Sequence, residues 1–288
     1  MTGRQFILAA TILFSTAAHA GKPVSEALPF TQIDFNPASM ATGFSNVATV
    51  ARVPFSQYRG AAGAGFMNYM PEIDGTRYIF GSAFIRHEGM GASLSVVRGI
   101  GAEIESEGFI PSETLVNAGL AWVLFPSLSM GLNVKYASED ILPDYNHSAI
   151  AADIFLAGEA GDFDFALGVS DLGQKVGSES TGDFSLPAAF SLAGGWKHAI
   201  SDRHEVKAQC RADRFFSGAF AAGAGAEYRY ASFAFARLGY HYGGESFMPS
   251  FAAAGLGILY KGFALDLAYI FASATLGGST CLNLAYRF

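Results

Sequence analysis

Charged side chains are scarce in this chain. Asp, Glu, Lys and Arg make up 15% of its 288 residues, whereas soluble domains usually contain about 25%. Acidic groups outnumber basic ones, 25 to 18, so the basic surface that nucleic acids require is missing. Because 51% of the residues are hydrophobic, we expect much of the molecular surface to avoid water.

A hydrophobic run long enough for a transmembrane helix, about 20 residues, is also missing. The short apolar stretch at 6–14 follows Arg4 and precedes Ala18, His19 and Ala20. This order of a positive charge, an apolar segment and small residues is typical of a secretory signal peptide. We therefore predict that residues 1–20 are a cleaved signal peptide and that the protein is exported.

The residue patterns of catalytic and metal sites are absent. The histidines of the mature chain are single, and no nucleophile elbow or phosphate loop occurs. The glycines at 60–65 lead into a strand instead of opening a helix, which argues against a dinucleotide site. Cys210 and Cys281 are too few and too far apart for a disulfide framework. We expect no enzyme activity, no cofactor and no bound metal.

What the chain does contain is a strand pattern repeated from residue 61 to its end. In the last segment Leu282 and Leu284 lie on one face, and Asn283 and Arg287 lie on the other. About fourteen such segments of roughly ten residues are separated by turn-forming clusters. Their approximate centres are Gly65, Ser82, Leu94, Gly119, Leu132, Asp153, Phe165, Leu192, Ala208, Gly225, Ala236, Gly255, Leu267 and Leu284.

Alternation alone fits both a soluble sandwich and a membrane barrel. An even strand number favours the barrel, as does the alternation of tight turns with long connections at 99–112, 138–147 and 171–187. We therefore predict an all-β fold: a closed antiparallel transmembrane β-barrel of about 14 strands at 61–288, in the lipid of the cell outer membrane. The final row of Leu284, Tyr286 and Phe288 is similar to the signal that outer-membrane assembly machinery recognises.

The polar faces of the strands would line the barrel lumen. We expect their opposite charges to pair across the interior, with a selective conduit as the alternative. Residues 21–60 do not alternate, and they predict an N-terminal plug or lid in the lumen, with a short helix around 45–53. The expected lumen charges are Lys135, Asp153, Asp164, Lys207, Arg211, Asp213, Glu227, Arg229, Arg237, Asp266 and Arg287.

From about Asn36 to the end, the sequence resembles the PorV/PorQ family, FadL-like barrels associated with type IX secretion. The stretch at 36–43 (Asn-Pro-Ala-Ser-Met-Ala-Thr-Gly) matches the family's N-terminal Ser-Met-Ala region in part, whereas Tyr58, Arg59 and Gly60 stand where the family has Trp-Asn-Pro. Shorter matches follow in order at 132–136, 171–175, 225–228, 237–240 and 282–288.

The resemblance implies an accessory protein that binds or tethers exported cargo, or other type IX secretion subunits, at the outer membrane without catalysis. The residues expected to bind such partners lie in two predicted outer loops: Glu103, Glu105 and Glu107 in the first, and Glu139, Asp140, Asp144 and Tyr145 in the second.

The alternative is a FadL-like transporter of hydrophobic small molecules with the N-terminal segment as its gate. It predicts an apolar pocket under the plug, with Phe155, Phe233, Phe235 and Leu259 on the lumen side.

Overall fold

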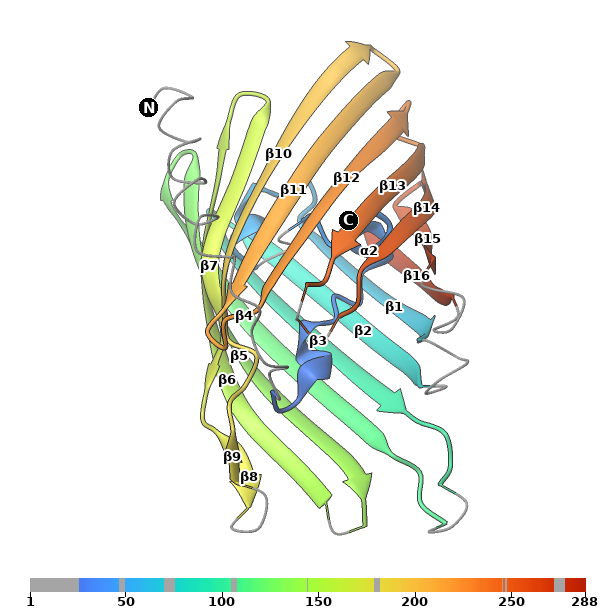
Figure 1. Cartoon of the computed structure of the whole chain (residues 1–288). Coiled ribbons are helices and arrows are strands. Elements are labelled where there is room, and N and C mark those ends of the chain that lie inside the picture. Colours follow the sequence, from blue (N-terminus) through green and yellow to red (C-terminus); the bar gives the residue numbers. More distant parts are fainter. Residues whose placement is uncertain are drawn as a thin grey trace.

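The computed structural model describes residues 26–46, 50–69, 76–104, 108–143, 145–178, 182–244, 246, 248–271 and 278–288. Within these ranges, fourteen strands form one closed antiparallel barrel (Figure 1). Each strand pairs with its neighbours along the chain, and the first strand pairs with the last to close the sheet. The predicted fold class is confirmed, whereas the predicted signal peptide lies outside the described residues.

Each of the fourteen predicted strand centres falls within one strand of the barrel. The strands are β1 (Gly60–Asn68), β2 (Arg77–His87), β3 (Met90–Ile100), β4 (Ser112–Phe125), β5 (Leu128–Leu142), β6 (Tyr145–Ala160), β7 (Phe163–Gly173), β10 (Ala189–Ser201), β11 (His204–Phe215), β12 (Phe220–Tyr230), β13 (Ala234–Tyr242), β14 (Phe251–Tyr260), β15 (Phe263–Phe271) and β16 (Ser279–Arg287).

The two faces of the sheet differ in the way that the sequence predicts. Along β15 every odd residue is exposed and every even residue is buried, so Leu265 and Leu267 point outward while Asp266 points into the lumen. In hydrocarbon an unpaired backbone N–H or C=O costs several kcal/mol, and a closed sheet leaves none at an edge. The outward apolar side chains and the closed sheet are both features expected of a β-barrel that spans a lipid bilayer.

The short connections are tight turns, as predicted. Between β2 and β3, and again between β14 and β15, two residues with positive φ make the turn: Glu88 with Gly89, and Lys261 with Gly262. A two-residue turn with positive φ at both positions matches the right-handed twist of the two strands that it connects.

The prediction of a long loop at 138–147 is wrong. Strand β5 continues to Leu142 and β6 begins at Tyr145, with Glu139 paired to His147. The strands of this hairpin continue through polar residues, so they lack the alternation of apolar side chains on which the strand prediction was based. The long connection at 171–187 contains a small two-stranded sheet, β8 (Val176–Ser178) with β9 (Gly182–Phe184).

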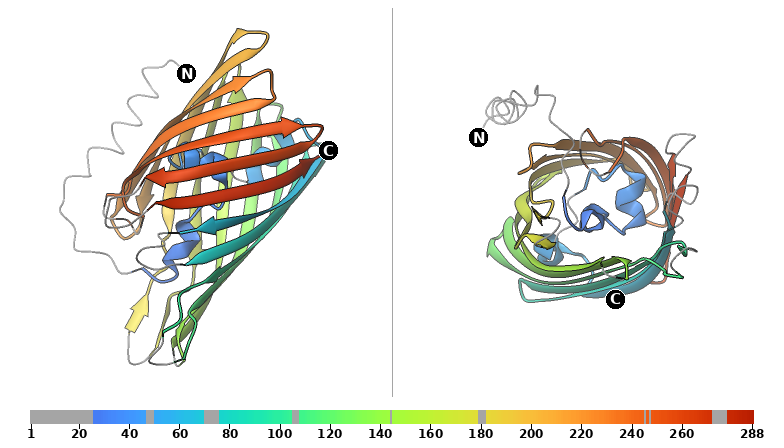
Figure 2. Two further views of the ribbon diagram at one scale, coloured as in Figure 1. Left: turned by 90° about the vertical axis from the view of Figure 1, so that its right-hand side faces the viewer. Right: turned by 60° about the horizontal axis from the view of Figure 1, so that its bottom comes forward.

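The N-terminal segment lies inside the barrel (Figure 2). We call its described residues, 26–46 and 50–59, the plug segment. It contains the 3-10 helices η1 (Pro29–Gln32) and η2 (Val50–Phe55) and the short helix α2 (Pro37–Ala41). The Asn36 side chain caps α2 by accepting a hydrogen bond from the Ala38 N–H at 3.0 Å. The helix predicted around 45–53 overlaps η2, whereas α2 was not predicted. No helix among the described residues is long and apolar enough to cross a membrane.

We predict that Leu256→Arg destabilises the barrel by about 2–4 kcal/mol, the cost of a cation near the midplane of a lipid-facing strand. Leu256 lies mid-strand in β14 with 63% of its surface exposed. Reversible urea unfolding in lipid vesicles measures the change, and Leu256→Phe is the apolar control. Equal stability of the two variants would contradict a lipid-facing position.

Candidate functional site

Glycines on the inner wall form a cradle for the plug segment. A Cβ on Gly223, Gly225 or Gly239, in β12 and β13, would collide with the backbone of residues 42–45. Gly43 itself has a φ of 69° and lies against the backbone of Tyr240. The backbone of the plug therefore touches the backbone of the wall, an approach that only glycine permits.

A second cradle holds η2 on the opposite wall. A Cβ on Gly91 of β3 would meet the Val53 side chain, and one on Gly131 of β5 would meet the backbone of Ala51. An ion pair ties this end of the plug segment to the wall, because Arg52 Nη2 lies 2.7 Å from Asp164 Oδ1. Lys207 Nζ reaches the other oxygen of Asp164 at 3.0 Å. The Ser129 hydroxyl also donates a hydrogen bond to the Ala51 carbonyl, so close packing, an ion pair and a hydrogen bond hold η2 on the wall.

The start of the plug segment is buried in an apolar cluster. Leu28 and Phe30 have at most 1% of their surface exposed, and they belong to a cluster that includes Leu186, from the connection after β9, and Met248, from the connection after β13. The Ala27 N–H also donates a hydrogen bond to the Ser185 carbonyl at 3.0 Å. These contacts join the plug segment to connections that follow the ends of β7 and β13.

Between the plug segment and the wall lies a cavity of about 570 Å³. This volume falls in the range of about 300–1,000 Å³ that is usual for small-molecule sites. Six phenylalanines contribute to its lining, two from the plug segment and four from the wall: Phe35, Phe44, Phe80, Phe84, Phe155 and Phe215. The cavity lies beside the plug segment, where the transporter hypothesis predicts an apolar pocket, but its lining combines these rings with at least as many polar side chains as apolar ones.

Asp34 is the carboxylate that the plug segment contributes to this cavity. It is half-buried, and enclosure by protein raises the pKa of Asp34 above its usual value. The polar Ser39 side chain and the nearby charge of Arg211 offset part of that rise in pKa.

Three other clusters place charge on the lining, and each is paired internally. Lys135 Nζ lies 3.0 Å from both Asp153 and Asp171, and Arg211 Nε lies 2.8 Å from Asp213. Arg52 is paired with Asp164, as described above. Lys135 joins three neighbouring strands, β5, β6 and β7, whereas Arg211 and Asp213 both belong to β11. A lone charge at such a buried site would be strongly unfavourable.

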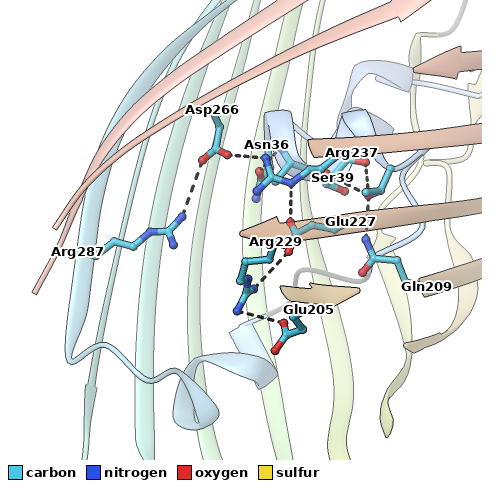
Figure 3. A network of polar contacts seen from close by, with 11 residues as sticks. Asn36, Ser39, Glu205, Gln209, Glu227, Arg229, Arg237, Asp266 and Arg287 are labelled. Atoms are coloured by element: carbon cyan, nitrogen blue, oxygen red, sulfur yellow. Dashed lines mark hydrogen bonds and ion pairs between the residues drawn. The ribbon is translucent and has the colours of Figure 1, made fainter. Parts of the chain in front are cut away.

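A longer chain of ion pairs runs across β11–β16 (Figure 3). Arg237 lies between Glu227 and Asp266, at 2.6 Å from each carboxylate. Arg229 extends the chain from Glu227 to Glu205 at 3.3 Å. Arg237 is 6% exposed, so solvent screens these contacts little.

The structure places all eleven expected lumen charges on the inner face and gives each an ion pair. Besides Lys135, Asp153 and Asp164, they are Lys207, Arg211, Asp213, Glu227, Arg229, Arg237, Asp266 and Arg287. The contact of Arg287 with Asp266 is the longest, at 3.9 Å. The charges pair along the wall, some within a strand and some between strands, and whether the lumen also conducts stays a prediction.

Four of the seven residues predicted to bind partners lie in the described part of the chain. Glu103 is exposed, but Glu139 is only 9% exposed and accepts a hydrogen bond from the backbone of Leu28 in the plug segment. Asp140 lies in β5 and accepts a hydrogen bond from Ser112 at 3.3 Å. Tyr145 begins β6, and the remaining three, Glu105, Glu107 and Asp144, lie outside the described residues.

Of the four apolar residues assigned to the lumen, Phe155 lines the cavity. Phe235 faces inward under the guanidinium groups of Arg229 and Arg237, each 5.2 Å from its ring, and Leu259 shares the inner face of β14. The placement of Phe233 is wrong: it lies in the turn before β13, is 43% exposed and packs against the outward Tyr260. A three-residue connection, 231–233, interrupts the alternation there.

Sequence reasoning missed Asp34 and the wall glycines. The glycines of β12–β14 at 223, 225, 239 and 255 occupy inward positions of the alternating pattern, and that inward clustering was the available signal for a docked backbone. Asp34 lies outside the repeating pattern, so only the fold shows that it reaches the cavity. No group of three or more His, Cys, Asp or Glu among the described residues is arranged to hold a metal.

The residues predicted as an assembly signal lie on the outer face at the end of the chain, in β16 and just after it. They are Leu284, Tyr286 and Phe288, and each has 45–56% of its surface exposed. Their recognition by assembly machinery stays a prediction. Both cysteines are free, Cys210 exposed and Cys281 buried.

No protein-family model and no curated protein matches this chain. Solved structures do. The toluene transporter TodX of P. putida is 12% identical, with a TM-score of 0.60 over 88% of this chain and 98% of TodX. The toluene transporter TbuX of Ralstonia pickettii is also 12% identical, with a TM-score of 0.59 over 90% of this chain and 100% of TbuX.

A Pseudomonas aeruginosa FadL homologue is similar as well, at 12% identity and a TM-score of 0.53 over 88% of this chain and 98% of the homologue. At such identities the likeness shows the fold alone. The chain therefore has the fold of the FadL-like outer-membrane barrels. None of the matches supports the more specific resemblance to PorV/PorQ proteins.

We predict that Gly239→Leu displaces the plug segment and raises ion conductance several-fold. The new side chain needs the space that Thr42 and Gly43 occupy, while the strand itself accepts leucine. Conductance in planar lipid bilayers measures the effect.

Gly194→Leu is the matched control, because a Cβ at Gly194 meets nothing closer than 3.8 Å and its position in β10 faces outward. Conductance that rises equally in both variants, or in neither, would contradict docking of the plug segment on Gly239.

Proposed function

We propose that the protein is an outer-membrane channel for small hydrophobic molecules, with the plug segment as its gate. The cavity between the plug segment and the aromatic wall carries this proposal. An apolar solute gains about 25 cal/mol for each Å² of surface that it removes from water, and the six phenylalanines offer such a surface inside the barrel. The TodX and TbuX structures, named as those of toluene transporters, support a small apolar substrate.

The contacts of the plug segment suit a gate. The barrel is held by the hydrogen bonds of its own closed sheet, so the plug segment can shift without breaking a strand pair. Its attachment at η2 includes packing on Gly91 and Gly131, the hydrogen bond from Ser129 to the Ala51 carbonyl and the contact of Arg52 with Asp164. A solute that enters the cavity would weaken these contacts by competing for the same wall.

The role in type IX secretion stays a prediction of the sequence resemblance. No comparison supports it, and three of the seven residues expected to bind cargo or secretion subunits lie outside the described residues. The described part of the second predicted loop is a strand hairpin with Glu139 turned inward against the plug segment. The channel is therefore the function that the geometry supports best.

We predict that Ser95→Trp reduces uptake of apolar solutes several-fold, because an indole at this inward position would fill the cavity. The measurement is accumulation of radiolabelled toluene and p-cresol by cells that carry the protein in an otherwise channel-deficient outer membrane.

Val96→Trp, on the adjacent outward position, is the control and should leave uptake unchanged. If cells with and without the protein take up both compounds equally, the proposed channel is overturned, whatever the behaviour of the two variants.

A further inference from the structure

None of the described residues that line the cavity offers a free cation to an anionic ligand. Among the residues that line it, Arg52, Lys135 and Arg211 carry the permanent positive charges, and each already lies within 3.0 Å of a carboxylate. A ligand carboxylate would have to displace one of these ion pairs or remain unpaired. Moving an unpaired anion out of water is strongly unfavourable, so the cavity disfavours fatty acids and aromatic acids.

Asp34, in contrast, is a hydrogen-bond acceptor with spare capacity. It lines the cavity and is half-buried. The Ser39 side chain and the Asn36 backbone are its polar neighbours, and they leave acceptor positions on a group that offers about four. Within the described part of the chain no ion pair involves Asp34, because the nearby Arg211 is held by Asp213 at 2.8 Å.

Binding of a pure hydrocarbon would carry a free-energy cost at this carboxylate. A ligand that cannot donate a hydrogen bond removes water from Asp34 without replacing the lost hydrogen bonds, and this is unfavourable for a buried polar group. A hydroxyl on an apolar ring restores the lost hydrogen bond and adds no charge. Phe35, the neighbour of Asp34 in the chain, also lines the cavity, so acceptor and aromatic surface lie together.

We propose that the cavity binds neutral, small aromatic molecules that carry a hydroxyl group, with Asp34 accepting the hydroxyl proton in a hydrogen bond and the phenylalanines enclosing the ring. This inference rests on the proposed channel and narrows its substrate class. Hydroxylated aromatics bind in preference to hydrocarbons of the same size, and aromatic carboxylates are excluded.

Three probes with the same ring and methyl group separate the classes: p-cresol donates a hydrogen bond, toluene does not, and p-toluate is an anion. Saturation-transfer NMR of the common methyl signal gives a Kd for each with the full-length protein in detergent at neutral pH, and empty micelles correct for partitioning. We expect p-cresol to bind about tenfold or more tightly than toluene, the usual effect of one hydrogen bond to a charged group. Binding of p-toluate should be weaker than that of toluene.

Two variants assign the selectivity to Asp34. Asp34→Leu should abolish the preference for p-cresol over toluene while toluene still binds. Asp34→Asn keeps an acceptor oxygen and removes the negative charge, so it should retain most of the preference and admit p-toluate more readily. Asp202→Asn, in the exposed turn between β10 and β11, is the matched control and should leave all three Kd values unchanged. Because the readout is a ratio of affinities, a merely structural effect of Asp34 would weaken all probes together.

Toluene binding as tightly as p-cresol, or p-toluate binding most tightly, would overturn this inference and leave the channel intact. An unchanged preference in Asp34→Leu would also overturn it. Failure of all three probes to bind the wild-type protein would overturn both the inference and the proposed channel.

Discussion

Closure of the backbone hydrogen-bond network is the constraint on which the rest of the molecule depends. A strand in lipid has no water to satisfy its edge, so β1 must pair with β16 along its length, from Ala61 with Arg287 to Asn68 with Thr280. Closure separates two environments that alternate along every strand. The outer face is apolar because it meets lipid, and the inner face is free to carry charge, glycine and a solute.

A barrel of fourteen strands encloses more space than inward side chains fill, and this chain fills it with its own N-terminal segment. The wall receives the segment on glycines where backbones touch, and it holds η2 through Arg52 and Asp164. The remaining volume of about 570 Å³ is the candidate site. The site therefore belongs neither to the wall nor to the plug segment alone, because Asp34 comes from one and Phe155 from the other.

Charge in the lumen has two distinct roles. The chain of Glu205, Arg229, Glu227, Arg237 and Asp266 joins strands β11, β12, β13 and β15 across the wall. Such pairs satisfy one another and leave little for a ligand, whereas Asp34 retains acceptor positions in the cavity. A polar lumen is therefore compatible with transport of apolar molecules, provided that its charges are mutually paired.

The sequence by itself determined the barrel, because alternation with a period of two is a local property that lipid and lumen impose on each strand. It predicted all fourteen strand centres and the inward charges, such as Arg237 and Asp266. It did not predict the partners of those charges, the strand character of residues 138–147 or the placement of Phe233, since these depend on register and on how far each hairpin extends. The cavity and the role of Asp34 were decided only by the tertiary structure, because the docking of a non-repeating segment on distant glycines leaves no periodic signal in the chain.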